Sequence, residues 1–135
     1  MEEMQTMMAA PNGNEIKMPP KVLVVDDEPA ITDTLAAVLK NSGYTVRTAY
    51  NADGAIALAR EFVPDLVITD VVMPGMNGIE LAIKIRNLLP LCKILLFSGQ
   101  AATADLLTDA KNRGYDFELL VKPIHPTDLL AKLRP

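Results

Sequence analysis

The sequence predicts an α/β fold in which five parallel strands form one doubly wound sheet. Short apolar runs of strand length alternate five times with amphipathic stretches of helix length. This rhythm is typical of consecutive βαβ units, whose strands lie parallel. The first run, at 21–25, is almost continuously apolar, as is expected of a strand that is buried on both faces.

The strands are expected at the apolar runs. The run at 44–49 alternates and contains β-branched residues, so it is predicted to lie nearer an edge of the sheet. The run at 64–69 ends at Asp70, before a loop rich in proline and glycine. The predicted strands are 21–25, 44–49, 64–69, 93–97 and 117–121.

The helices are expected where apolar residues recur at helical spacing between these runs. Asn51 can cap the second helix, and Pro126 can begin the last one. A weaker helix is predicted at 103–113, ending at Gly114. The side chains expected to be buried are Ile31, Leu35, Val38 and Leu39; Ala55, Ala59 and Phe62; Leu81, Ile85, Leu88 and Leu89; and Leu129, Leu130 and Leu133.

The first twenty residues differ from the remainder. They contain five of the seven methionines and show neither helical nor strand periodicity. We therefore expect 1–20 to be a flexible N-terminal extension and 21–135 to be a single folded domain.

Composition excludes several classes of protein. Acidic residues outnumber basic ones 17 to 13, which argues against direct binding of nucleic acid. No apolar run is long enough to insert into a membrane, and a single cysteine excludes an intramolecular disulfide. The N-terminus lacks the pattern of a signal peptide, so a cytoplasmic location is expected.

Polar side chains follow four of the five predicted strands. Asp26 and Asp27 come after the first strand, Asp70 after the third, Ser98 after the fourth and Lys122 after the fifth. In an open parallel sheet, ligands bind beyond the carboxyl ends of the strands. We therefore expect these side chains to converge at one edge of the sheet.

The residue types in this set suit phosphoryl transfer. Carboxylate oxygens without histidine or cysteine are the ligands that Mg²⁺ prefers. Lys122 can pair with a phosphoryl group, Ser98 can donate a hydrogen bond to it, and Asp70 can attack it. The sequence thus predicts a Mg²⁺-dependent site that receives a phosphoryl group.

The motifs, taken in order, resemble those of a known family. The stretches 24–28, 70–78, 98–99 and 122–123 resemble the receiver domain of two-component response regulators, which has a flavodoxin-like (βα)5 fold. The resemblance covers 21–135 and implies a switch that is no enzyme but assists its own phosphorylation and dephosphorylation. It implies a histidine kinase or phosphotransfer protein as phosphoryl donor, an unknown downstream protein target and a possible homodimer.

The resemblance also implies the roles of individual residues. Asp70 would be the phospho-acceptor, and Ser98 and Lys122 would engage the phosphoryl group. One position departs from the family pattern, because Leu119 stands where receivers usually carry the aromatic residue that reports phosphorylation. The implied Mg²⁺ ligands are Asp26, Asp27, Asp70 and the backbone carbonyl of Val72.

Two other functions are compatible with parts of the pattern. A Mg²⁺-dependent phosphatase or phosphotransferase with an aspartyl nucleophile is the first, although such enzymes usually place the nucleophile after the first strand. A flavodoxin-like cofactor binder is the second, although no phosphate-binding loop follows Val25. Three further residues are expected to have structural roles: Glu28 in a first helical turn, His125 in solvent, and Cys92 as a small apolar side chain.

Overall fold

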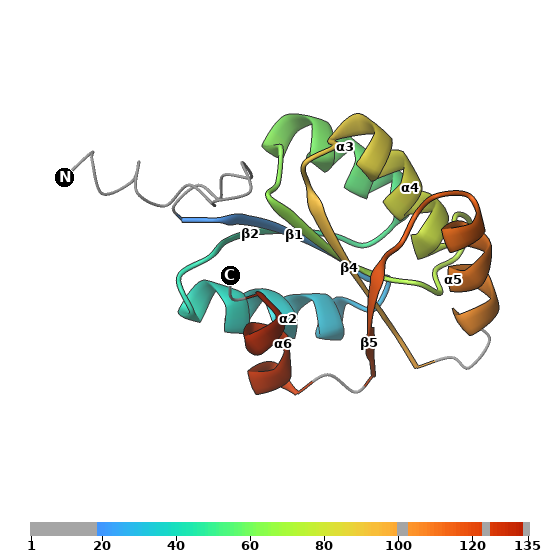
Figure 1. Cartoon of the computed structure of the whole chain (residues 1–135). Helices are drawn as coiled ribbons and strands as arrows, with labels where there is room; N and C mark the ends of the chain where they lie inside the picture. Colours follow the sequence, from blue (N-terminus) through green and yellow to red (C-terminus); the bar gives the residue numbers. More distant parts are fainter. Residues whose placement is uncertain (1–18, 100–102, 123–124, 134–135) are drawn as a thin grey trace, which may run out of the picture.

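The computed structural model describes residues 19–99, 103–122 and 125–133. Their five strands form one parallel sheet in the order β2-β1-β3-β4-β5, which confirms the predicted fold class (Figure 1). The elements in chain order are β1 (Lys21–Val25), α2 (Pro29–Asn41), β2 (Thr45–Ala49), α3 (Ala52–Phe62), β3 (Leu66–Asp70), α4 (Gly78–Leu88), β4 (Lys93–Ser98), α5 (Thr103–Asn112), β5 (Glu118–Val121) and α6 (Pro126–Leu133).

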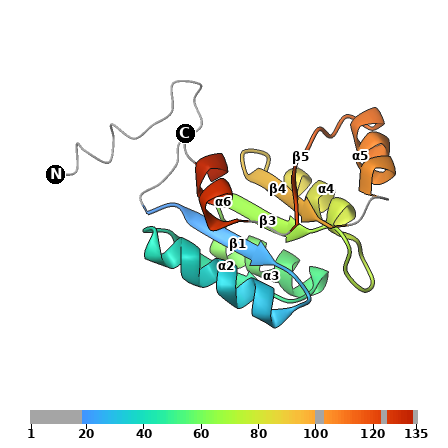
Figure 2. The ribbon, with the colours of Figure 1, turned by 90° about the horizontal axis from the view of Figure 1, so that it is seen from below.

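The strand order makes the sheet doubly wound. The chain passes from β1 outward to β2, then returns past β1 and builds the other half of the sheet. Because crossovers between parallel strands are right-handed, this reversal puts helices on both faces. Helices α2 and α6 cover one face, and α3, α4 and α5 cover the other (Figures 1 and 2).

Two apolar cores fill the spaces between the sheet and these helices. Along β1, Val22 and Val24 belong to the core beneath α2 and α6, whereas Leu23 and Val25 belong to the core beneath α3, α4 and α5. Successive side chains of a strand point to opposite faces, so a strand that is buried on both sides must be apolar throughout. The continuous apolar run at the start of the domain is explained in this way.

The observed bounds differ slightly from the predicted ones, and two differences matter for function. Asp70 and Ser98 are the last residues of β3 and β4 and not the first residues after them. Strand β2 lies at an edge of the sheet, as predicted. The boundary at Lys21 stays a prediction, because residues 1–18 lie outside the described part of the chain.

The buried stripe of α2 is rotated from the predicted one. Leu35 and Leu39 are buried as expected, but Ile31 and Val38 are only half-buried. Thr32 is fully buried instead, because its hydroxyl donates to the carbonyl oxygens of Asp26 and Glu28. Apolar periodicity alone could not show that a threonine would occupy this face.

Helix α5 is mostly exposed. Among its described side chains only Ala110 is fully buried, and Leu107 is half-buried. An ion pair ties its C-terminal end to α4: a guanidinium nitrogen of Arg113 lies 2.8 Å from Oε2 of Glu80.

Among the helices of residues 19–99, 103–122 and 125–133, none combines the length and the apolar character that crossing a bilayer requires.

Helix α4 begins directly against the backbone of β3. The side chain of Asn77 caps the helix by accepting from the Glu80 amide at 2.9 Å, and the Gly78 amide donates to the Val71 carbonyl at 2.7 Å. A Cβ atom on Gly78 would lie 1.8 Å from the carbonyl oxygen of Asp70. Residue 78 must therefore be glycine for α4 to sit this close to Asp70.

Replacement of this glycine tests the close approach. Gly78→Ala is expected to lower the free energy of unfolding by about 3 kcal/mol or more, because the clash is with backbone that cannot move aside. Gly43→Ala is a matched control: φ at Gly43 is +99° but a Cβ there meets open space, so the cost is only about 1 to 2 kcal/mol. Urea denaturation measures both, and equal losses would contradict the proposed clash.

Candidate functional site

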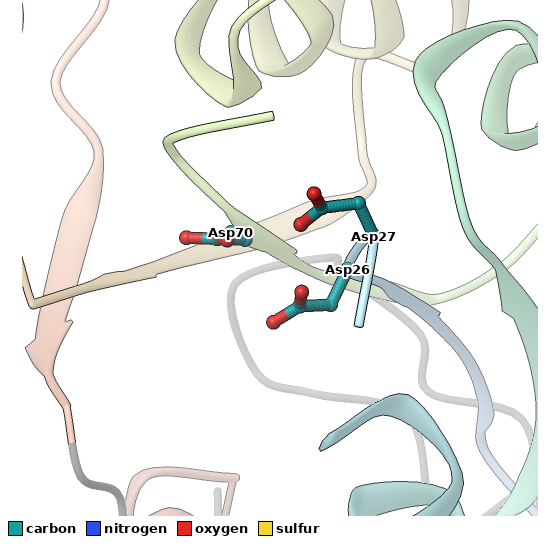
Figure 3. Close-up of side chains that lie close together, drawn as sticks. All are labelled: Asp26, Asp27 and Asp70. Atoms are coloured by element: carbon teal, nitrogen blue, oxygen red, sulfur yellow. The ribbon is translucent and has the colours of Figure 1, made fainter. Parts of the chain in front are cut away.

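Three carboxylates meet at the carboxyl edge of the sheet. Asp26 and Asp27 follow β1, and Asp70 ends the neighbouring strand β3 (Figure 3). One oxygen from each carboxylate lies within 4.8 Å of the others. The strand order therefore brings together residues that are 43 or more positions apart in the chain, as the sequence predicted.

The two aspartates that follow β1 have different environments. Asp26 is fully buried, its amide donates to the Ala49 carbonyl, and its Oδ1 accepts from the Glu28 amide at 2.9 Å. Asp27 is exposed. The buried carboxylate is thus held by backbone on one side, whereas the exposed one faces the open side of the site.

Asp70 is 5% exposed and sits between β1 and β4. Its backbone is fixed from the β4 side, because it pairs with Phe97 and because the following amide, that of Val71, donates to the Phe97 carbonyl. The Val72 amide approaches Oδ1 of Asp70 at 3.4 Å. The backbone of Asp70 is therefore held in place beside Asp26 and Asp27 (Figure 3).

Lys122 pairs with both buried carboxylates of this cluster. Its Nζ lies 3.3 Å from Oδ2 of Asp26 and 3.3 Å from Oδ2 of Asp70. The Lys122 amide donates to the Ser98 carbonyl at 3.0 Å, which fixes the lysine backbone at the end of β5. Ser98 is itself buried at the same edge.

The pKa values of Asp70 and Lys122 are both raised, so both groups hold their protons more tightly than they would in water. Burial raises the pKa of Asp70 above its ordinary 3.8, and the nearby Asp26 adds to this rise, outweighing the lowering by Lys122. Burial disfavours the charged form of Lys122, but its two carboxylate partners outweigh burial and raise the pKa of the amine. One ammonium therefore does not fully balance the acids of this pocket.

The structure pairs Lys122 with Asp26 as well as with Asp70, a contact that sequence reasoning did not foresee. Sequence reasoning also missed two further residues. Gly78 fits closely against Asp70, and the ring of Phe97 lies beneath the Lys122 ammonium. A signal for Phe97 was present, since a large aromatic directly precedes Ser98 in a strand expected beside Asp70.

Three residues expected to be structural lie outside the acidic cluster. Glu28 was expected in the first helical turn but is the N-cap residue, one position before α2 begins, and its exposed side chain makes no cap hydrogen bond. His125 is exposed, as expected, and its Nδ1 accepts from the Thr127 amide at 3.2 Å. Cys92 is buried, as expected of a small apolar side chain, and burial raises the pKa of its thiol to about 12.

Leu119, at the position where an aromatic was expected, is half-buried against the core beneath α3, α4 and α5. Phe117 is buried in the same core, stacks on Tyr115 at 6.1 Å, and has the Arg86 guanidinium over its ring. The buried aromatic at this edge thus lies on the approach to β5 and contacts both Tyr115 and Arg86.

Comparison with known proteins places this geometry in a family. Residues 22–134 match the response regulator receiver domain. The probable transcriptional regulatory protein TcrX of Mycobacterium tuberculosis is 34% identical over 116 residues, which are 86% of this chain and 49% of that protein. The DNA-binding response regulator MtrA of Mycolicibacterium smegmatis is 31% identical over 84% of this chain and 49% of its own length. The chain thus spans about half the length of these curated relatives.

The fold of this chain also matches that of solved structures. The Vibrio cholerae chemotaxis protein CheY4 has a TM-score of 0.76 and 33% identity over 84% of this chain and 95% of its own. The Thermotoga maritima response regulator TrrA, solved in complex with Mg²⁺ and BeF, has a TM-score of 0.74 and 33% identity over 84% of this chain and 96% of its own.

These relatives correct one expectation. The acidic composition was taken to argue against nucleic acid as a partner, yet several relatives are named as DNA-binding response regulators. The inference was wrong because it treated the charge of one segment as that of a whole protein. Relatives about twice as long as the matched segment carry further sequence whose charge this segment does not constrain.

The match to the receiver domain begins within β1 and ends just after α6, and it includes every strand end that supplies a side chain to the acidic pocket. The chain therefore belongs to the response regulator receiver domain family, whose members are phosphorylation-activated switches of two-component signalling.

Proposed function

We propose that Asp70 is the residue at which this switch is phosphorylated. The observation that carries the proposal is the position of its carboxylate, which lies 3.3 Å from the Lys122 ammonium and beside two further carboxylates at the open edge of the sheet. The donor would be the phosphohistidine of a histidine kinase or of a phosphotransfer protein.

In the proposed reaction, an oxygen of Asp70 attacks the phosphorus atom while the bond from phosphorus to the donor imidazole breaks. The electron pair of that bond leaves with the imidazole nitrogen, and an aspartyl phosphate forms. Lys122 lies close enough to Asp70 to pair with the new phosphoryl oxygens, and Ser98 ends the adjacent strand on the same side. Such transfer depends mainly on positioning and on charge neutralisation.

The donor set also fits Mg²⁺. Asp26, Asp27 and Asp70 offer three hard oxygen ligands that are close enough together to surround one small cation, and the carbonyl of Val72 is a fourth proposed ligand. When bound, Mg²⁺ would supply the positive charge that Lys122 alone does not. The solved complex of TrrA with Mg²⁺ and BeF supports this assignment.

We further propose that the chain assists its own phosphorylation and dephosphorylation, since the attacking carboxylate and the charge-balancing groups all come from this one chain. Relatives with names of transcriptional and DNA-binding regulators support an output in the control of transcription. The cytoplasmic location and the homodimer stay predictions.

The alternative of a phosphatase with an aspartyl nucleophile is not favoured by the comparisons. Stoichiometric labelling and turnover separate the two functions, because a switch takes up one phosphoryl group per chain whereas an enzyme releases product continuously.

The phospho-acceptor can be tested directly. Acetyl phosphate with Mg²⁺ is expected to add one phosphoryl group to the wild-type chain, and Asp70→Asn is expected to abolish the addition, as measured by intact-protein mass spectrometry. Asp116→Asn removes an exposed acid elsewhere and is expected to leave labelling unchanged. Labelling of Asp70→Asn at the wild-type level would disprove the assignment.

The metal site makes a separate prediction. Asp27→Asn is expected to weaken Mg²⁺ binding by about tenfold or more, because it removes one of the few charged ligands of a hard cation. Isothermal titration calorimetry measures the affinity. The control Asp33→Asn alters an exposed acid of α2 that bonds Tyr50, and it is expected to bind as the wild type does. Equal affinities in all three proteins would refute the ligand set.

The raised pKa of Asp70 predicts that, in the absence of divalent cations, the ionised pocket lowers the free energy of unfolding in a pH-dependent way. The folded chain binds the Asp70 proton more tightly than the unfolded chain, so the cost is fully present above the folded-state pKa. It is lost as the pH falls toward 3.8. Asp70→Asn is thus expected to be more stable than the wild type at pH 7, by on the order of 1 kcal/mol, with the difference fading in acid.

Urea denaturation with chelator across pH 3.5 to 8 measures this difference. Asp116→Asn is again the control and is expected to change stability by less than about 0.5 kcal/mol at every pH. A less stable Asp70→Asn variant at pH 7 would show that the Lys122 ion pair outweighs burial.

A further inference from the structure

The Lys122 ammonium has a third contact besides its two carboxylates. Its Nζ lies over the ring of Phe97, 4.9 Å from the ring centroid. The face of an aromatic ring carries partial negative charge and attracts a cation at this distance. The lysine ammonium thus contacts Asp26, Asp70 and an aromatic face.

Phe97 is placed for this contact by the sheet. It is the residue before Ser98 in β4, and it pairs with Asp70 of β3. Its side chain is fully buried in the core beneath α2 and α6, together with Ile68 and Leu129. A ring enclosed in a close-packed core keeps one orientation, so its face is a fixed surface.

The ring differs from the other two partners of Lys122 in one respect. Asp26 and Asp70 are also the carboxylates proposed to hold Mg²⁺ and to carry the phosphoryl group, so their oxygens are shared. A neutral aromatic face is no ligand for a hard cation such as Mg²⁺. The contact with Phe97 is therefore expected to persist when the carboxylates are engaged.

We propose that Phe97 is a positioning residue for Lys122, fixing the ammonium where it meets the phosphoryl oxygens on Asp70. This inference rests on the proposed function of Asp70. A lysine side chain has four rotatable bonds and is costly to fix, and the ring limits the positions open to it. An aliphatic side chain at 97 fills the core but leaves the ammonium without this surface.

The first test compares two phenylalanines. Phe97→Leu is expected to slow labelling by acetyl phosphate with Mg²⁺ by about threefold to thirtyfold, the range of a cation–π contact. Phe117→Leu is the matched control, because Phe117 is also buried with a cation over its ring, here Arg86 at 5.4 Å, but belongs to the opposite core. It is expected to label at the wild-type rate.

The second test weakens the ring face without changing its shape. Phenylalanines with one and then three ring fluorines at position 97 are expected to slow labelling stepwise, since fluorine withdraws charge from the face while the core stays filled. The same substitutions at position 117 are expected to have no effect. Equal labelling rates for all rings at position 97 would overturn the inference, even if Phe97→Leu fails to fold.

A third measurement needs no phosphodonor. The ring current of Phe97 is expected to shift the NMR signals of the Lys122 Cε protons, and this shift should vanish in Phe97→Leu and persist in Phe117→Leu. Absence of the shift in the wild type would overturn the contact itself. Failure of the wild type to be labelled would instead overturn the proposed function, so the two failures are distinct.

Discussion

The site depends on one electrostatic constraint, the confinement of three carboxylates at the edge of a sheet that offers them one ammonium. Such a cluster repels itself unless cations are present. The burial of Asp26 and Asp70 strengthens this repulsion, because water is excluded from both. The free chain is thus kept in a state that gains from binding positive charge, which is the property that a Mg²⁺-dependent phosphoryl acceptor needs.

The backbone keeps the acids in place despite their repulsion. Three amide hydrogen bonds link the strand ends in series: Val71 to Phe97, Lys122 to Ser98, and Gly78 to Val71. None of these bonds uses a side chain of the site. The positions of the carboxylates are therefore determined by the sheet and by the start of α4, and the side chains remain available for chemistry.

The sequence was informative where function follows from topology. Alternating apolar runs and amphipathic stretches predict the parallel sheet, and the rule that strand ends converge then brings Asp26, Asp70 and Lys122 together. It was uninformative where packing decides. The distance between Gly78 and the Asp70 carbonyl, and the burial of Thr32, depend on how helices sit on the sheet, and neither periodicity nor turn signals encode that. The charge argument about nucleic acid failed for a different reason, since it applied a local property to a class of longer proteins.

The sparse packing of α5 has a consequence for the energy scale of signalling. The helix follows Ser98 in the chain, buries little apolar surface, and is anchored to α4 near its far end by Arg113 and Glu80. Local opening costs least where few apolar contacts must be broken. A contact worth only on the order of 1 kcal/mol, such as a single new hydrogen bond, would therefore change the equilibrium of local opening at α5 severalfold. Helices that bury more side chains, such as α2 and α4, would respond less to so small a signal.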